Sequence, residues 1–150
     1  MSTVIPAINE MRRLTQPYFD YVFLCRTWHP LDQNISFASN SRLPDHCVQG
    51  SFGAEFHKDL VILGSDFEIR KGVLSGSKEQ TNSCFGEDGE DTALTKRLQQ
   101  LGVKRVYCCG LGLDRGVGTS AEHASMRGFD SYVIKDCTKA VDEYAEHSMI

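Results

Sequence analysis

Apolar residues near the start of the chain repeat at the spacing of a helix. Four of them stand three residues apart and would share one helical face: Ile5, Ile8, Met11 and Leu14. Pro17 ends this segment, because proline cannot continue a helix. The residues that follow, 18–25 (YFDYVFLC), are aromatic and apolar enough to predict a buried strand.

Further along the chain, shorter apolar segments alternate between the strand pattern and the helix pattern. The predicted strands cover residues 67–70, 103–109 and 129–135, and the predicted helices cover 93–101, 119–128 and 139–147. Thr119 and Glu122 have the spacing of a capping box at the start of the second helix. Strands that alternate with helices indicate an α/β fold with a parallel sheet.

Two long segments follow neither pattern. Residues 26–53 are irregular and contain several Pro, Asn and Gly, and so long a loop in a compact domain is usually functional. Residues 75–91 are polar and contain glycine, which predicts an excursion over the surface.

The alternating pattern also predicts where a ligand would bind. In open parallel sheets, ligands bind beyond the carboxyl ends of the strands. This rule places three segments on one rim: 27–29 (TWH), 70–72 (RKG) and 107–119 (YCCGLGLDRGVGT).

The third segment is a glycine-rich turn between a predicted strand and a predicted helix. Its glycines do not have the spacing of a phosphate-binding loop or of a dinucleotide fingerprint, so a nucleotide is disfavoured. Glycine allows tight backbone geometry, which leaves amide N–H groups pointing outward at a helix N-terminus. Composition alone favours the alternative, a tight turn that binds nothing.

Composition narrows the class of protein further. With 150 residues, 41% of them hydrophobic and 24% charged, the chain fits a single globular domain over residues 1–150. A net charge of −4 argues against nucleic acid as the main partner, and no apolar run has the length of a transmembrane helix. The N-terminal segment lacks the pattern of a signal peptide, so we expect a cytoplasmic protein, with the nucleus left open.

The candidate chemistry rests on a few side chains. His29 and His46 could hold Zn²⁺ or Fe²⁺, although two histidines are as compatible with surface or hydrogen-bonded roles. Lys71 could stabilise negative charge at the end of a strand, or it could be a solvated lysine. The six cysteines form no C-x-x-C pair, which predicts that most of them are small buried hydrophobes.

Read together, several segments closely resemble the nicotinamidase/pyrazinamidase group of the isochorismatase-like cysteine hydrolases. They are TWHPLDQNISFASN (27–40), LPDHCVQGSFGAEFHKDL (43–60), RKG (70–72) and the segment 102–142. The resemblance implies a Rossmann-like parallel sheet flanked by helices. It also implies hydrolysis of nicotinamide to nicotinate and ammonia in NAD salvage, through a Cys thiolate, an Asp base, a Lys and a divalent metal.

Carried over residue by residue, the resemblance gives an incomplete site. Lys71 matches the catalytic lysine, and His29 and His46 match two metal ligands. Thr27 stands in the slot of an anionic Asp ligand, which implies that zinc, or iron or manganese in its place, is bound weakly or not at all. Gly116 stands in the slot of the nucleophilic cysteine, where no covalent intermediate can form.

The resemblance implies that the glycine-rich turn supplies both the nucleophile and the oxyanion hole, and only the second role is left to it. Its amides, around Gly112 and Gly116, would still form the oxyanion hole. Cys108 and Cys109 precede the nucleophile slot on a strand and are interpreted as buried structural thiols, and Cys47 matches a noncatalytic position.

The resemblance also implies that the first strand of the family, with its Asp base, and the last strand are not represented in the chain. Two interpretations stay open, an inactive pseudoenzyme and the product of a truncated gene. As a pseudoenzyme the chain would bind a pyridine carboxamide or a metal without catalysis. It could instead form a homo-oligomer or join an intact homologue that supplies the missing strand, because the neighbours of that strand would expose unpaired edges.

Overall fold

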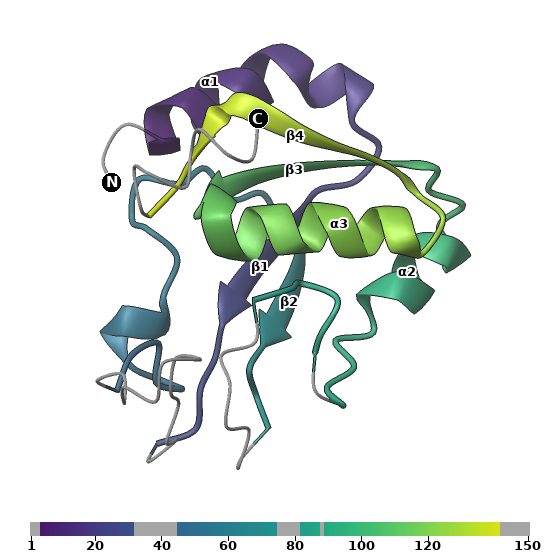
Figure 1. Ribbon diagram of the computed structural model, residues 1–150. Coiled ribbons are helices and arrows are strands. Elements are labelled where there is room, and N and C mark those ends of the chain that lie inside the picture. Colours follow the sequence, from purple (N-terminus) through teal and green to yellow (C-terminus); the bar gives the residue numbers. More distant parts are fainter. Residues whose placement is uncertain (1–3, 32–44, 75–81, 88, 142–150) are drawn as a thin grey trace.

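The computed structural model describes residues 4–31, 45–74, 82–87 and 89–141, which form an α/β fold (Figure 1). The elements in chain order are α1 (Val4–Thr15), η1 (Gln16–Tyr18), β1 (Phe23–Thr27), η2 (Phe52–Ala54), β2 (Phe67–Lys71), α2 (Leu94–Gln100), β3 (Arg105–Leu111), the π-helical turn η3 (Leu113–Val117), α3 (Gly118–Met126) and β4 (Asp130–Lys139).

The described strands form two parallel pairs. β1 pairs with β2 in a register that runs from Phe23 opposite Phe67 to Thr27 opposite Lys71. β3 pairs with β4, with a register shift between Cys108 and Gly110. The parallel direction predicted from the alternating pattern is confirmed, but no described strand hydrogen-bonds to both pairs, so they do not form one continuous sheet.

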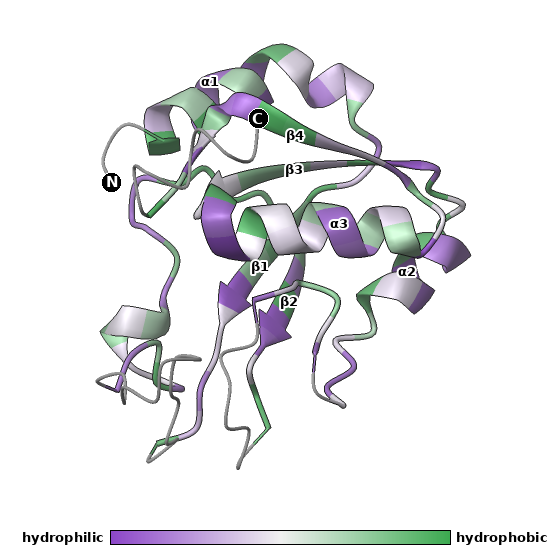
Figure 2. Cartoon of the chain, in the orientation of Figure 1, coloured by the Kyte–Doolittle hydropathy of each residue, from purple (hydrophilic) through white to green (hydrophobic). Residues whose placement is uncertain are grey.

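Helices cover both faces of the β3–β4 pair, with α1 on one side and α3 on the other (Figure 1). The main hydrophobic core brings together side chains from β2, α2, α3 and two loops: Ile69, Phe85, Leu94, Leu98, Ala124 and Phe129. The carboxyl ends of β1 and β2 are hydrophilic (Figure 2), because Arg26, Thr27, Arg70 and Lys71 stand there. None of the helices in the described ranges is long and apolar enough to cross a membrane.

Some predicted boundaries are confirmed and others are wrong. The first helix ends at Thr15 and the helix of residues 94–100 buries Leu94 and Leu98, as the apolar spacing predicts. The first strand begins at Phe23, because Pro17 lies in a short 3₁₀ turn that precedes it. The predicted capping box is also wrong. Val117 holds the N-cap position of α3 without a side-chain hydrogen bond, since the chain enters α3 directly from η3.

The segment predicted as a surface excursion is partly buried. Its described residues include Phe85, which is 4% exposed and belongs to the core, and Ser83, which is fully buried. The prediction failed here because the surrounding sequence is polar while two of its side chains point inward. The predicted helix 139–147 begins inside β4, which continues to Lys139, and its residues from 142 onward lie outside the described residues.

Candidate active site

The segments 27–29 and 70–72 meet at the carboxyl ends of β1 and β2. Thr27 and Lys71 are partners in the strand register, and the backbone N–H of Trp28 donates to the carbonyl of Lys71 at 2.8 Å. Because these strands are parallel, the residues that follow them emerge at the same edge. The prediction that these two segments share one rim is therefore confirmed.

Lys71 is buried at this rim, with 9% of its surface exposed. Its Nζ donates a hydrogen bond to the backbone carbonyl of Asn82. Within the described ranges, Lys71 forms no ion pair with a carboxylate. A buried ammonium that meets no counterion among the described residues is costly, and a bound anion would offset part of that cost.

Gly116, in the η3 turn, lies against Lys71. A Cβ built at Gly116 would stand 3.3 Å from Lys71 Nζ and 3.4 Å from the Asn82 carbonyl oxygen. A side chain at position 116 would therefore point at the lysine. The structure brings these two sequence-predicted residues together, while their roles stay predictions.

The η3 turn is closed by its own hydrogen bonds. The N–H groups of Arg115 and Val117 donate to the Gly112 carbonyl at 3.1 and 3.0 Å, and Ser120 Oγ donates to the Gly116 carbonyl at 2.5 Å. The amides of Arg115 and Val117 are thus engaged, and an oxyanion would have to bind other N–H groups of the turn. The oxyanion role of Gly112 and Gly116 stays a prediction.

Position 112 has no room for a side chain. A Cβ there would stand 2.7 Å from Val141 Cγ2 and 2.8 Å from Asp114 Oδ1. Asp114 Oδ1 also accepts a hydrogen bond from the Val141 N–H at 2.8 Å, which holds the end of β4 against the turn. Gly112 is required by this close approach.

His29 is almost completely buried, at 2% exposure. Its backbone N–H donates to the Cys47 carbonyl at 2.9 Å, and Nδ1 of its ring lies 2.9 Å from the Gly72 carbonyl. Because a carbonyl only accepts, Nδ1 is assigned the proton and Nε2 keeps its lone pair. Nε2 is buried and has no hydrogen-bond partner among the described residues.

The surroundings of His29 favour the neutral imidazole. Burial lowers the pKa of His29, the Gly72 carbonyl opposes this shift, and the charges of His46 and Lys71 reinforce it. A neutral imidazole with a free, buried Nε2 is the form that binds a metal. His29 alone therefore has the properties of a ligand.

The donor set around His29 does not complete a metal site. The His46 ring lies at a centroid distance of 5.1 Å from the His29 ring, at an interplanar angle of 82°. In the part of the chain that the structure describes, no group of three His, Cys, Asp or Glu side chains could hold a metal ion. Catalytic zinc sites use three protein ligands, so the described residues do not complete one.

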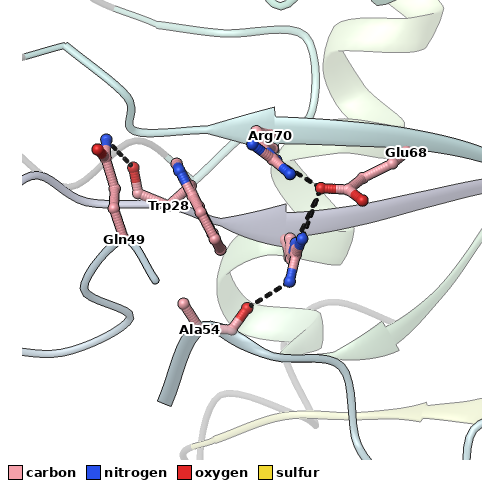
Figure 3. Close-up of polar contacts among 6 residues, drawn as sticks. Trp28, Gln49, Ala54, Glu68 and Arg70 are labelled. Atoms are coloured by element: carbon pink, nitrogen blue, oxygen red, sulfur yellow. Dashed lines mark hydrogen bonds and ion pairs between the residues drawn. The ribbon is translucent and has the colours of Figure 1, made fainter. Parts of the chain in front are cut away.

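The opposite face of the β1–β2 pair fixes the backbone that carries these residues (Figure 3). The guanidinium carbons of Arg26 and Arg70 lie 4.5 and 4.3 Å from the centroid of the Trp28 ring, and Glu68 Oε1 accepts from both arginines. Gln49 Nε2 donates to the Trp28 carbonyl at 3.1 Å. Successive strand residues point to opposite faces, so holding Trp28 on one face positions Thr27 and His29 on the other.

Three residues that the sequence pattern did not assign to the site contact Lys71 or its neighbours: Asn82, Cys84 and Glu90. The Glu90 carboxylate accepts from the N–H groups of Gly72 and Val73 at 2.8 and 2.7 Å, and the Asn82 carbonyl accepts from Lys71. Ser120 connects these residues to the turn, because its Oγ also accepts from the Cys84 N–H at 2.8 Å. No spacing in the sequence signals these contacts, since each bridges segments that are distant in the chain.

Three of the cysteines behave as inert thiols. Burial raises the pKa of Cys108 to about 12 and that of Cys109 to about 11, and it also raises the pKa of Cys47. A thiol with a raised pKa is a poor nucleophile at neutral pH. The interpretation of Cys108 and Cys109 as structural thiols is consistent with this environment.

A buried lysine thus faces a glycine-rich strand-to-helix turn at the carboxyl edge of parallel strands, and the turn has no side chain at Gly116, the position nearest the lysine. The sequence model of the isochorismatase domain matches residues 1–150, and the chain belongs to the isochorismatase-domain family.

The most informative relatives are nicotinamidases and pyrazinamidases. The nicotinamidase of Acinetobacter baylyi is 32% identical over 156 residues, which cover 93% of this chain and 71% of that protein. The pyrazinamidase of Pyrococcus horikoshii, in complex with zinc, superimposes with a TM-score of 0.84 at 31% identity over 99% of this chain and 78% of its own. PnC1 from L. infantum, in complex with nicotinate, superimposes with a TM-score of 0.84 at 33% identity, over 99% of this chain and 73% of that chain.

Proposed function

We propose that the chain binds small pyridine carboxamides and their carboxylates at Lys71 and the η3 turn, on a nicotinamidase scaffold that lacks the usual covalent step. The observation that carries this proposal is the 3.3 Å separation between Lys71 Nζ and a Cβ at Gly116. By similarity to nicotinamidases, this turn would carry the nucleophile beside the lysine, but a glycine cannot form a thioester.

The electrostatics of the site favour an anionic ligand over a neutral one. Lys71 is buried and forms no ion pair with the described carboxylates, so an anionic ligand would supply its counterion. By similarity to nicotinamidases, the ligand ring would be a pyridine, and the anion would be nicotinate, the product of amide hydrolysis. We therefore propose that nicotinate is preferred over the neutral nicotinamide.

Calorimetric titration tests this proposal directly. We expect nicotinate to bind more tightly than nicotinamide, and Lys71→Met to weaken nicotinate binding by about tenfold or more, because a charge-assisted hydrogen bond contributes about 1.5–3 kcal/mol. Lys58→Met is the matched control, since Lys58 lies on the surface beside Asp59. Added zinc should change the affinity little, because the described donors do not complete a metal site.

Release of ammonia from nicotinamide is measured on the same samples. If the parent protein releases ammonia and Lys71→Met does not, the noncatalytic part of the proposal is wrong and the chain is an active nicotinamidase. Equal binding of nicotinate by the parent protein and by Lys71→Met would remove its basis altogether.

The division of the described strands into two pairs favours a second proposal, association with another chain. Unpaired strand edges readily accept another strand, and β1 and β3 each pair with one described strand only. We expect self-association that increases with protein concentration in light scattering after size exclusion, or a complex with an intact homologue where one is supplied. A monomer at every concentration, alone and with the homologue, would count against this proposal.

A further inference from the structure

The described residues 82–87 and 89–90 form no helix or strand, yet they fix the end of the Lys71 side chain. The backbone carbonyl of Asn82 accepts a hydrogen bond from Lys71 Nζ. A lysine side chain turns about several single bonds, so the direction of its ammonium depends on the partner that holds it. The position of the Lys71 ammonium therefore depends on whatever keeps the Asn82 carbonyl in place.

The Glu87 side chain holds the backbone at Asn82. Its Oε2 accepts hydrogen bonds from the N–H groups of Asn82 and Ser83, at 2.5 and 3.0 Å. The next N–H group, that of Cys84, donates to Ser120 Oγ at 2.8 Å. Because these N–H groups donate to side chains and not to a neighbouring strand, side chains set the direction of the peptide bonds here. Without Glu87, the Asn82 carbonyl could turn away from the lysine.

The Glu90 side chain holds the backbone on the other side of Lys71, directly after it. Its two carboxylate oxygens accept from consecutive N–H groups, that of Gly72 at 2.8 Å and that of Val73 at 2.7 Å. Gly72 has a φ of +68°. Turns of this kind direct successive N–H groups toward one point, where an anion fits. The Glu90 carboxylate is that anion, and it fixes the direction in which the chain leaves β2.

A tight turn keeps the two carboxylates together. The Glu90 N–H donates to the Glu87 carbonyl at 2.9 Å, and the Gly86 N–H donates to the Ser83 carbonyl at 3.2 Å. A Cβ at Gly86 would collide with the Glu90 carbonyl oxygen, so the backbone is closely packed here. Within the described ranges, neither carboxylate forms an ion pair with Lys71. Their influence on the lysine therefore passes through the backbone.

We propose that Glu87 and Glu90 are positioning residues, which hold the Lys71 ammonium in the direction that a carboxylate ligand needs. This role rests on the proposed binding of nicotinate at Lys71. It gives an expectation opposite in sign to that of charge alone. Removal of a nearby negative charge should strengthen the binding of an anion, whereas removal of a positioning residue weakens it.

Calorimetric titration with nicotinate measures this sign. Glu90→Gln keeps the shape of the side chain but has one acceptor oxygen, and Glu90→Asp keeps the charge but is one methylene shorter. We expect both variants to weaken binding by about threefold to tenfold, less than Lys71→Met, because the ammonium is still present but is free to turn. Glu87→Gln should weaken binding less than Glu90→Gln, because one oxygen of Glu87 accepts both hydrogen bonds and an amide oxygen can replace it.

The position of the ammonium is measured without a ligand. An ammonium that is buried and hydrogen-bonded exchanges its protons slowly with water, so it gives a proton–nitrogen NMR signal, which Lys71→Met identifies by its loss. We expect this signal to broaden in Glu90→Gln and in Glu87→Ala. Glu122→Gln is the matched control and should keep the signal, since it removes the same charge from an exposed position of α3. Urea denaturation shows that each variant is folded.

The two measurements separate this role from the proposed function. A parent protein that binds no nicotinate would contradict the proposed function, while the ammonium signal would still test the positioning. Tighter nicotinate binding by Glu90→Gln, equal effects of Glu90→Gln and Glu87→Gln, or an unchanged ammonium signal in Glu90→Gln would overturn the positioning role. Rapid hydrogen exchange of the Gly72 and Val73 N–H groups in the parent would also overturn it, and needs no substitution.

Discussion

Gly116→Cys is expected to give a thiol that alkylates rapidly but hydrolyses nicotinamide only slowly. The new Cβ would lie 3.3 Å from Lys71 Nζ and 3.4 Å from the Asn82 carbonyl oxygen. These contacts are tight, but Nζ is the far end of a flexible side chain and can shift by a few tenths of an ångström. The variant should therefore fold with its sulfur beside the ammonium.

The position of this sulfur explains the expected reactivity. A neighbouring ammonium stabilises a thiolate and lowers its pKa, which makes a cysteine nucleophilic at neutral pH. Hydrolysis needs more than a nucleophile, however. The resemblance to nicotinamidases implies an Asp base and an anionic metal ligand, and Thr27 stands in the slot of that ligand. Without an anionic ligand at position 27 the implied metal would bind weakly, so we expect slow hydrolysis even with the thiol restored.

Two measurements check this expectation. Peptide mapping after brief treatment with iodoacetamide gives the alkylation rate of each cysteine separately, and ammonia release gives the rate of hydrolysis. Gly64→Cys is the matched control, because a Cβ at Gly64 meets nothing within 4 Å and would place a thiol in open space. Equal alkylation of the two new thiols would refute the adjacency to Lys71, and rapid turnover by Gly116→Cys would show that Gly116 alone prevents hydrolysis.

The sequence predicts the rim of the site well because that rim depends on local patterns and one topological rule. Residues 67–70 have a strand pattern weaker than that of the other predicted strands, and the structure extends this strand only to Lys71. Once β1 and β2 are parallel, Thr27 and Lys71 must emerge at the same edge. The resemblance to nicotinamidases added Gly116, which no pattern of polar and apolar residues would have placed against Lys71.

The rest of the site depends on contacts between distant segments, which local patterns do not encode. Residues 75–91 are polar, yet Asn82 accepts from Lys71 and Glu90 accepts from the N–H of Gly72. These contacts have no fixed spacing, so a single sequence could not predict them.

Gly72→Ala is expected to destabilise the protein strongly, because an alanine there would strain the backbone and would also clash with the His29 ring. Its φ of +68° lies in the left-handed region, and a Cβ there would stand 2.5 Å from His29 Cε1 and 2.7 Å from His29 Nδ1. The backbone strain costs about 1–2 kcal/mol, and forcing the buried ring aside adds about 1–3 kcal/mol. We expect a loss of about 3 kcal/mol in the free energy of unfolding, measured by urea denaturation.

Gly50→Ala separates the two contributions. Gly50 has a similar φ of +74°, but a Cβ there meets nothing within 4 Å. Its replacement should therefore cost only the backbone strain, about 1–2 kcal/mol. If both variants lose the same stability, the contact between Gly72 and His29 does not constrain the fold.

A double-mutant cycle with His29→Ala then identifies the ring as the obstacle. His29→Ala alone removes a buried imidazole and leaves the Gly72 carbonyl without the Nδ1 donor that lies 2.9 Å away. In that background Gly72→Ala has no ring to displace, so its cost should fall to the backbone strain, with a coupling energy of about 1–3 kcal/mol. Additive losses would mean that the ring is free to move, and His29 Nε2 could then not be held in a fixed position for a ligand.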